Sequence, residues 1–302
     1  MLKELRASHF IAVSIALLCS VSAEASASRT FVATTGNDAN TATNCGATTP
    51  CRSFFAALSV TNAGGELVVL NSGGYGPASI AQPVVMTAIG VDASISVITT
   101  GATGLTINTA GNVTLNGLNL HGEAAGVNGI DVTQVGYLRL YNMLIENFTS
   151  YGVNMIFSGS LAVYGSEMND NAAGGINLGG LANPVVAYVS GSSFDNNAIG
   201  VGVGLNSSAT VADSSALNSS TAGFLAVKGQ LTLINSRSEF NGSGMVSEDS
   251  GVLYFGNCLI TNNSFAYQIA SGGTMAGTNP GTSFIDPAQS TMGTLSPAIA
   301  LQ

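Results

Sequence analysis

The chain has 302 residues, of which 46% are hydrophobic and 8% are charged, and its formal net charge is −9. This composition is too apolar for a disordered chain. Seven basic residues against sixteen acidic ones leave no basic patch for phosphate contacts, so nucleic acid is excluded as a partner.

The first residues have the pattern of a secretory signal peptide, which we expect to span residues 1–27. A basic start precedes an apolar run over residues 10–21, and Ala-Ser-Ala at residues 25–27 is a small-x-small cleavage site. The run is shorter than the roughly 20 residues that a spanning helix needs. A retained anchor and a lipoprotein site at Cys19 are the less favoured alternatives. We therefore expect a secreted or periplasmic protein without a membrane span.

Residues 28–65 differ from the rest of the chain and are predicted to form an N-terminal cap. Cys45 and Cys51 enclose a short loop, and export permits a disulfide between them. Residues 50–58 then place apolar side chains at helical spacing, which predicts a short helix. A helix here would cover the open end of a repeat array.

Residues 66–270 are predicted to form that repeat array, most regularly in seven copies of an apolar-x-apolar unit. The copies start at Val113, Leu138, Leu161, Ala187, Ala209, Leu231 and Leu253. A fixed period near 22 residues is typical of a solenoid, in which each repeat buries its apolar side against its neighbours. One continuous rod is therefore expected in place of two compact domains.

Each copy is predicted to contain three short strands with sharp corners between them. Four positions after each start stands a residue that tolerates the left-handed conformation: Gly117, Asn142, Gly165, Gly191, Asp213, Asn235 and Asn257. Gly or Asn interrupts every window long enough for a helical repeat, and the framework of a leucine-rich repeat is missing. The predicted fold is all-β, a single-stranded right-handed parallel β-helix of about nine rungs with a short N-terminal capping helix.

Two further features concern the end of the array. Cys258 follows the start of the last copy at an inward position, which favours a buried, inert thiol over a reactive one. Residues 271–302 lose the repeat and are rich in Gly, Thr, Ser and Pro. We expect them to form a C-terminal cap, with a disordered tail or an export signal as the alternative.

Three short motifs carry a resemblance to a known group of proteins. They read TFVATTGND at residues 30–38, PCRSFFAAL at residues 50–58, and AGGELVVL at residues 63–70, with GYG at residues 74–76. With the rungs that follow, they resemble secreted right-handed parallel β-helix proteins of the pectin-lyase-like superfamily. That superfamily includes pectate and pectin lyases, polygalacturonases, phage tailspikes and exported proteins without known chemistry, so the resemblance implies a fold more than an activity.

The catalytic motifs that the resemblance implies are missing from the sequence. Hydrolases of that superfamily use an aspartate cluster with Gly-His-Gly, and neither Asp-Asp nor Gly-His-Gly occurs here. Its lyases use a basic residue beside carboxylates that bind calcium. We therefore predict no metal site and no cofactor, with Ca²⁺ expected only if the protein is lyase-like.

Outward positions supply the remaining candidate residues. His121 and Glu146 should stack on neighbouring rungs, and with Arg139 they are the catalytic candidates. The candidate binding residues are outward on the first strands, where aromatic rings could stack on sugars: Arg139, Tyr141, Tyr164 and Tyr188. The plainer alternative, ordinary solvated strand positions, is favoured for both sets.

These observations favour a monomeric, exported β-helix scaffold that binds carbohydrate or a cell-surface component without catalysis. One alternative is a polysaccharide lyase or glycoside hydrolase acting on acidic glycans. The other is a purely structural surface protein. Each predicts a different outcome in a screen for glycan binding and depolymerisation.

Overall fold

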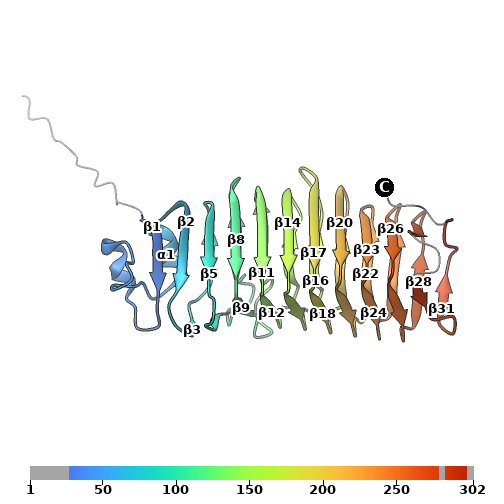
Figure 1. The fold of residues 1–302 in the computed structure, drawn as a ribbon, viewed down its shortest axis with the longest axis horizontal. Coiled ribbons are helices and arrows are strands. Elements are labelled where there is room, and N and C mark those ends of the chain that lie inside the picture. Colours follow the sequence, from blue (N-terminus) through green and yellow to red (C-terminus); the bar gives the residue numbers. More distant parts are fainter. Residues whose placement is uncertain (1–26, 279–282, 298–302) are drawn as a thin grey trace, which may run out of the picture.

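The structure is a computed structural model that describes residues 27–278 and 283–297. The predicted signal peptide, with Cys19, lies outside the described residues except for Ala27. The described chain forms one elongated rod whose strands lie side by side along its length, with the short helix at the N-terminal end (Figure 1).

Three parallel sheets, here named A, B and C, run along the rod. The strands of sheet A are β1 Ala27–Val32, β2 Thr61–Val69, β5 Val84–Thr87, β8 Asn112–Asn116, β11 Tyr137–Tyr141, β14 Gly159–Tyr164, β17 Val185–Ser190, β20 Ser207–Ala212, β23 Gln230–Ile234, β26 Val252–Gly256 and β29 Thr274–Gly277. The strands of sheet B are β3 Gly73–Gly74, β6 Ala93–Ser96, β9 Leu118–His121, β12 Leu144–Glu146, β15 Glu167–Asn169, β18 Ser193–Asp195, β21 Ser215–Leu217, β24 Arg237–Glu239, β27 Leu259–Thr261 and β30 Phe284–Ile285. The strands of sheet C are β4 Ala78–Ile80, β7 Leu105–Asn108, β10 Ile130–Gln134, β13 Tyr151–Met155, β16 Gly174–Leu178, β19 Ile199–Val203, β22 Ala222–Val227, β25 Ser243–Glu248, β28 Phe265–Ile269 and β31 Ser290–Met292.

Each coil passes from sheet A to B to C and returns to the next strand of sheet A. We name the turn between sheets A and B corner 1, and the turn between sheets B and C corner 2. All seven corner residues predicted from the repeat lie at corner 1 and have positive φ. Gly and Asn reach this conformation at low cost, which explains their place in the repeat.

The core is a set of apolar columns inside the coil. Leu115, Leu140, Val163 and Val189 pair in register across neighbouring strands of sheet A, and all four are fully buried. Alternation along each strand sends one residue inward and the next outward. Each such buried side chain contributes about 2 kcal/mol of hydrophobic stabilisation. The predicted register is therefore confirmed.

Inward polar residues stack beside these apolar columns at both corners. At corner 1, the hydroxyl oxygens of Ser192 and Ser214 accept hydrogen bonds from the backbone N–H of Ser166 and Ser192, each at 3.2 Å. At corner 2, Asn241 Oδ1 accepts from Ser219 N–H at 2.7 Å while its Nδ2 donates to Ala216 O at 3.0 Å. These buried ladders satisfy backbone groups that the sheets leave unpaired.

Cys258 occupies a serine position in the ladder at corner 1. It is buried and free, and its Sγ donates to Gly256 O at 3.3 Å as the serine hydroxyls do to equivalent carbonyls. Its backbone N–H in turn donates to Ser283 Oγ at 3.0 Å. Burial raises the pKa of the Cys258 thiol, which opposes formation of the reactive thiolate.

The N-terminal end is closed by a 3₁₀ helix, η1 Asp38–Thr43, and by α1 Phe54–Val60. Ser53 caps α1, because its Oγ accepts from Ala56 N–H at 3.1 Å. Phe54 is fully buried with its ring centroid 5.1 Å from that of Tyr75. A disulfide joins Cys45 and Cys51, whose Cα atoms lie 4.9 Å apart.

Both ends extend the rod beyond the nine rungs expected. Strand β1 lies in the predicted cap and pairs with β2, while β29 lies in the predicted tail and pairs with β26. Further along, Ser296 N–H donates to Met275 O at 2.8 Å, so the chain folds back on β29. Among the described residues, no helix is long and apolar enough to cross a membrane.

Candidate functional site

His121 and Glu146 meet on the outer face of sheet B. They pair in register between β9 and β12, and His121 Nδ1 lies 3.0 Å from Glu146 Oε1. Both side chains are about one quarter exposed. The predicted stacking on neighbouring coils is therefore confirmed, while a chemical role stays a prediction.

Arg139 does not join this pair. It lies on strand β11 of sheet A, and its guanidinium carbon sits 4.0 Å from the ring centroid of Tyr137. A planar cation over an aromatic ring is held by attraction to the ring electrons. The three catalytic candidates His121, Arg139 and Glu146 are thus divided between two sheets that face different directions.

The four tyrosines nearest Arg139 form one surface, which we name the tyrosine surface: Tyr137, Tyr141, Tyr164 and Tyr188. Tyr141 and Tyr164 pair in register and their rings stack, with centroids 5.1 Å apart and planes 11° apart. Tyr188 lies 6.0 Å from Tyr164 and is tilted by 50°. Tyr137 was not among the predicted binding residues, although strand alternation places it outward two positions before Arg139.

The stacking decides which parts of these rings can contact a ligand. Tyr141 and Tyr164 cover each other's faces, whereas Tyr188 is 40% exposed. Ala162 also points outward, between Arg139 and Tyr188 in register, yet the larger side chains bury it fully. Partial burial raises the pKa of the Tyr164 phenol, and the neighbouring tyrosines add to the effect. The surface is therefore closely packed.

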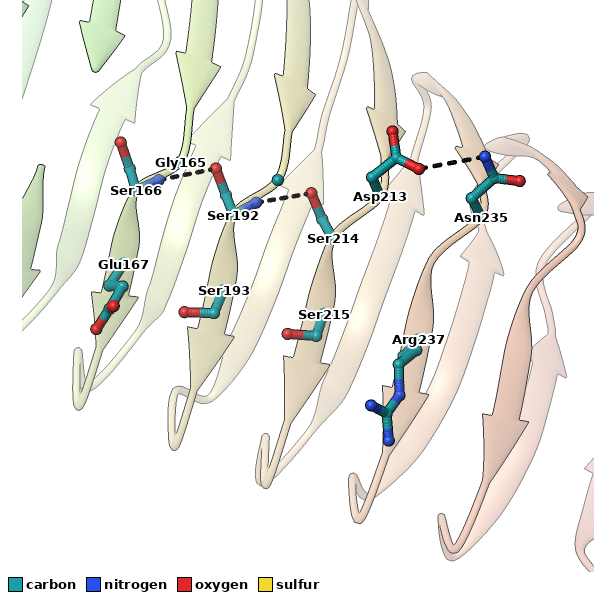
Figure 2. A pocket seen from close by; sticks show the side chains of 11 residues that line it. Gly165, Ser166, Glu167, Ser192, Ser193, Asp213, Ser214, Ser215, Asn235 and Arg237 are labelled. Carbon is teal, nitrogen blue, oxygen red and sulfur yellow. Dashed lines mark hydrogen bonds between the residues drawn. The ribbon is translucent and has the colours of Figure 1, made fainter. Parts of the chain in front are cut away.

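A groove of about 450 Å³ runs along corner 1 across four coils (Figure 2). We name it the corner groove. Its lining comes from the corner itself and from the first residue of each sheet B strand. It is lined by Gly165, Ser166, Glu167, Gly191, Ser192, Ser193, Asp213, Ser214, Ser215, Asn235 and Arg237.

Two glycines open this groove. On the C-terminal side, corner residues form an exposed ladder in which Asn235 Nδ2 donates to Asp213 Oδ1 at 3.2 Å (Figure 2). On the N-terminal side, Asn142 Nδ2 donates to Asn116 Oδ1 at 3.3 Å. Gly165 and Gly191 stand between these two pairs at the same corner position. The ladder therefore lacks side chains over two coils, and the space they would fill is hollow.

Polar side chains line the groove along the first position of each sheet B strand. In order along the rod they are Glu167, Ser193, Ser215 and Arg237, which pair in register. The Arg237 guanidinium forms an ion pair with Glu239, a carboxylate that is only 6% exposed. Glu167 lies at the other end and is exposed. The groove was not predicted from the sequence, because Gly and Asn are equivalent as corner residues and differ only in whether a side chain fills the space outside.

No cluster of three or more His, Cys, Asp or Glu that could hold a metal ion exists within residues 27–278 and 283–297. The expectation of Ca²⁺ in a lyase-like protein stays a prediction. The chemistry available at these surfaces is hydrogen bonding, aromatic contact and proton transfer at the His121 and Glu146 pair.

Comparison with known proteins supports the fold. Residues 183–282 match the family model of the right-handed β-helix region. The crystal structure of pectate lyase Pel9A is similar, with a TM-score of 0.62 and 15% sequence identity, covering 89% of this chain and 79% of that chain. No curated protein matches the sequence. The chain therefore has a right-handed parallel β-helix fold, and this fold is similar to that of pectate lyase Pel9A.

Proposed function

We propose that the protein is an exported β-helix scaffold that binds carbohydrate through the tyrosine surface. The observation that carries this proposal is the packed row of Tyr141, Tyr164 and Tyr188 beside Arg139 on a flat sheet face. Aromatic rings with hydroxyl groups offer apolar contact and hydrogen bonds together, which suits sugars. The structural likeness to a pectate lyase supports a carbohydrate ligand but carries no catalytic residue over.

The contacts divide among the residues of the surface. Tyr188 offers the most exposed ring for apolar contact with a sugar. Arg139 is held over Tyr137 and offers planar N–H donors for sugar hydroxyl groups. The phenol groups of the stacked tyrosines add donors and acceptors along their exposed edges. Because the side chains already pack against one another, little conformational entropy is lost on binding.

Export is part of the proposal. It is supported by the signal-peptide pattern of residues 1–27 and by the disulfide between Cys45 and Cys51, a bond that persists in oxidising compartments. Cleavage after residue 27 is tested by sequencing the N-terminus of the exported protein.

A glycan screen scored for both binding and depolymerisation tests the function. We expect binding without cleavage, and we expect Tyr188→Ala to weaken it about tenfold, which corresponds to about 1.4 kcal/mol. Tyr254→Ala is the matched control, because Tyr254 is an outward tyrosine on β26 of the same sheet, away from the surface. Binding that is unchanged by Tyr188→Ala, or turnover of pectin or alginate, contradicts the proposal.

The contact between His121 and Glu146 supports a second candidate, a polysaccharide lyase or glycoside hydrolase. The Nδ1 atom of His121 faces the Glu146 carboxylate, which leaves the Nε2 atom of His121 for proton transfer. This candidate predicts that His121→Ala abolishes depolymerisation while Arg139→Ala, on the other sheet, retains it. A screen in which no glycan is cleaved removes this candidate.

A further inference from the structure

We infer that the corner groove is a second binding site, separate from the tyrosine surface, and that its ligand is an uncharged sugar chain. The inference goes beyond the proposed function, because it assigns a ligand to other residues on another part of the coil. It follows from the free hydrogen-bonding groups of the groove, its charge and its length.

The groove presents hydrogen-bonding groups that the described chain does not use. Ser193 and Ser215 point outward from the middle two coils, and neither hydroxyl has a hydrogen-bond partner among the described residues (Figure 2). The hydroxyls of Ser192 and Ser214 beneath them already accept from the backbone of the preceding coil and donate to a carbonyl of their own coil. The outer serines are therefore free for a ligand, while the inner ones hold the floor in place.

The charge of the groove selects against acidic chains. Glu167 and Asp213 contribute two negative charges, and the positive charge of Arg237 is paired with Glu239. The chain as a whole has a net charge of −9. A uronate or sulfate group within a Debye length of these carboxylates would be repelled. Sugar hydroxyl groups, in contrast, can donate to the carboxylates and accept from the guanidinium.

The length of the groove fits an extended chain. Its lining spans the four coils that carry Glu167, Ser193, Ser215 and Arg237. Three strand spacings amount to roughly 14 Å along the rod. A polar groove of this length can contact successive units of a linear oligosaccharide lying parallel to the rod.

Filling the groove is the direct test, and Gly191→Asn does this with little strain. Gly191 has φ of +61°, a conformation that Asn adopts at this corner on other coils, and a Cβ there would lie 3.9 Å from the nearest atom, Gly165 N. Its side chain would continue the ladder of Asp213 and Asn235 into the hollow. Gly101→Asn is the control, with φ of +83° and nothing within 4 Å of the new Cβ.

The experiment is isothermal titration with neutral oligosaccharides of glucose, mannose, xylose and N-acetylglucosamine, and with galacturonate oligomers of equal length. We expect at least one neutral chain to bind, Gly191→Asn to weaken it at least about tenfold, and Gly101→Asn to leave it unchanged. Unfolding curves confirm that Gly191→Asn is folded.

Three results would overturn the inference. They are the absence of binding by any neutral chain, equal or tighter binding of galacturonate, and full affinity in Gly191→Asn. Loss of binding in Tyr188→Ala but not in Gly191→Asn would support the tyrosine surface alone. The groove and the proposed function therefore fail independently.

Discussion

Corner 1 and corner 2 flank sheet B, and both place a residue of positive φ outside and a polar residue inside the coil. At corner 2 the inner column is Asn171, Asn197, Ser219, Asn241 and Asn263, and it is interrupted once, at Ser219. At corner 1 the outer column lacks a side chain at Gly117, Gly165 and Gly191. A gap inside leaves buried polar atoms without partners, whereas a gap outside exposes them to water. Inner columns therefore determine stability, and outer columns are free to vary for binding.

The largest effect is expected from a charge inside the core. Leu140 is fully buried between Leu115 and Val163, so Leu140→Asp should prevent folding because the carboxylate has no partner there. Thr210→Asp is the control, at an outward position of sheet A. Circular dichroism of the purified variants checks this, and a stable Leu140→Asp variant would show that the assigned register is wrong.

The second-largest loss of stability is expected from breaking the inner ladder at corner 2. Asn241→Ala removes the acceptor of Ser219 N–H and the donor to Ala216 O, both buried, and we expect a loss of about 2–4 kcal/mol in the free energy of unfolding. Asn235→Gly removes an exposed amide at corner 1 without straining the positive φ of this position, and it should cost less than about 0.5 kcal/mol. Urea unfolding of both variants measures the free energy that each loses. Equal losses would contradict the distinction between inner and outer columns.

Completing the inner ladder should stabilise the protein. The Ser219 hydroxyl is buried without a partner among the described residues, and an Asn there could accept from Asn197 N–H as Asn241 does from Ser219 N–H. We expect Ser219→Asn to raise the free energy of unfolding by about 1 kcal/mol. Ser219→Ala, the control, removes the unpaired hydroxyl without extending the ladder and should gain less. A lower urea midpoint for Ser219→Asn than for Ser219→Ala would refute this.

The smallest effect concerns Cys258 at corner 1 and depends on pH. Because the folded pKa of its thiol is raised by burial, its contribution to stability is complete below the unfolded pKa of about 8.5 and is lost as pH rises through the folded pKa. Cys258→Ser keeps the ladder without this titration. We therefore expect wild type to lose more stability than Cys258→Ser between neutral and alkaline pH. Thermal unfolding midpoints measured across that pH range check this. Equal falls in the midpoints of wild type and Cys258→Ser would contradict the expectation.

Much of the fold could be predicted because its signals are local. Alternation along each strand and Gly or Asn at each corner set the register, and Leu140 and Cys258 lie inside as expected. The end strands β1 and β29 were missed as rungs, because backbone pairing extends a sheet without requiring the repeat pattern.

The candidate sites were less predictable. The contact of His121 with Glu146 followed from register, but the mutual stacking of Tyr141 and Tyr164 depends on side-chain rotamers that the sequence does not reveal. The corner groove depends on missing side chains at Gly165 and Gly191, which become visible only when the corner residues are stacked in space. In the sequence, a missing side chain in the outer column is marked only by a glycine, and glycine is common in this chain.

The most direct test of the distinction between inner and outer columns is to measure stability and glycan affinity together for Gly191→Asn and Ser219→Asn. We expect Gly191→Asn to lose binding of a neutral sugar chain and to keep its unfolding midpoint. We expect Ser219→Asn to keep binding and to gain stability. The reverse pattern, with Gly191→Asn unfolding early or Ser219→Asn losing its ligand, would contradict the distinction.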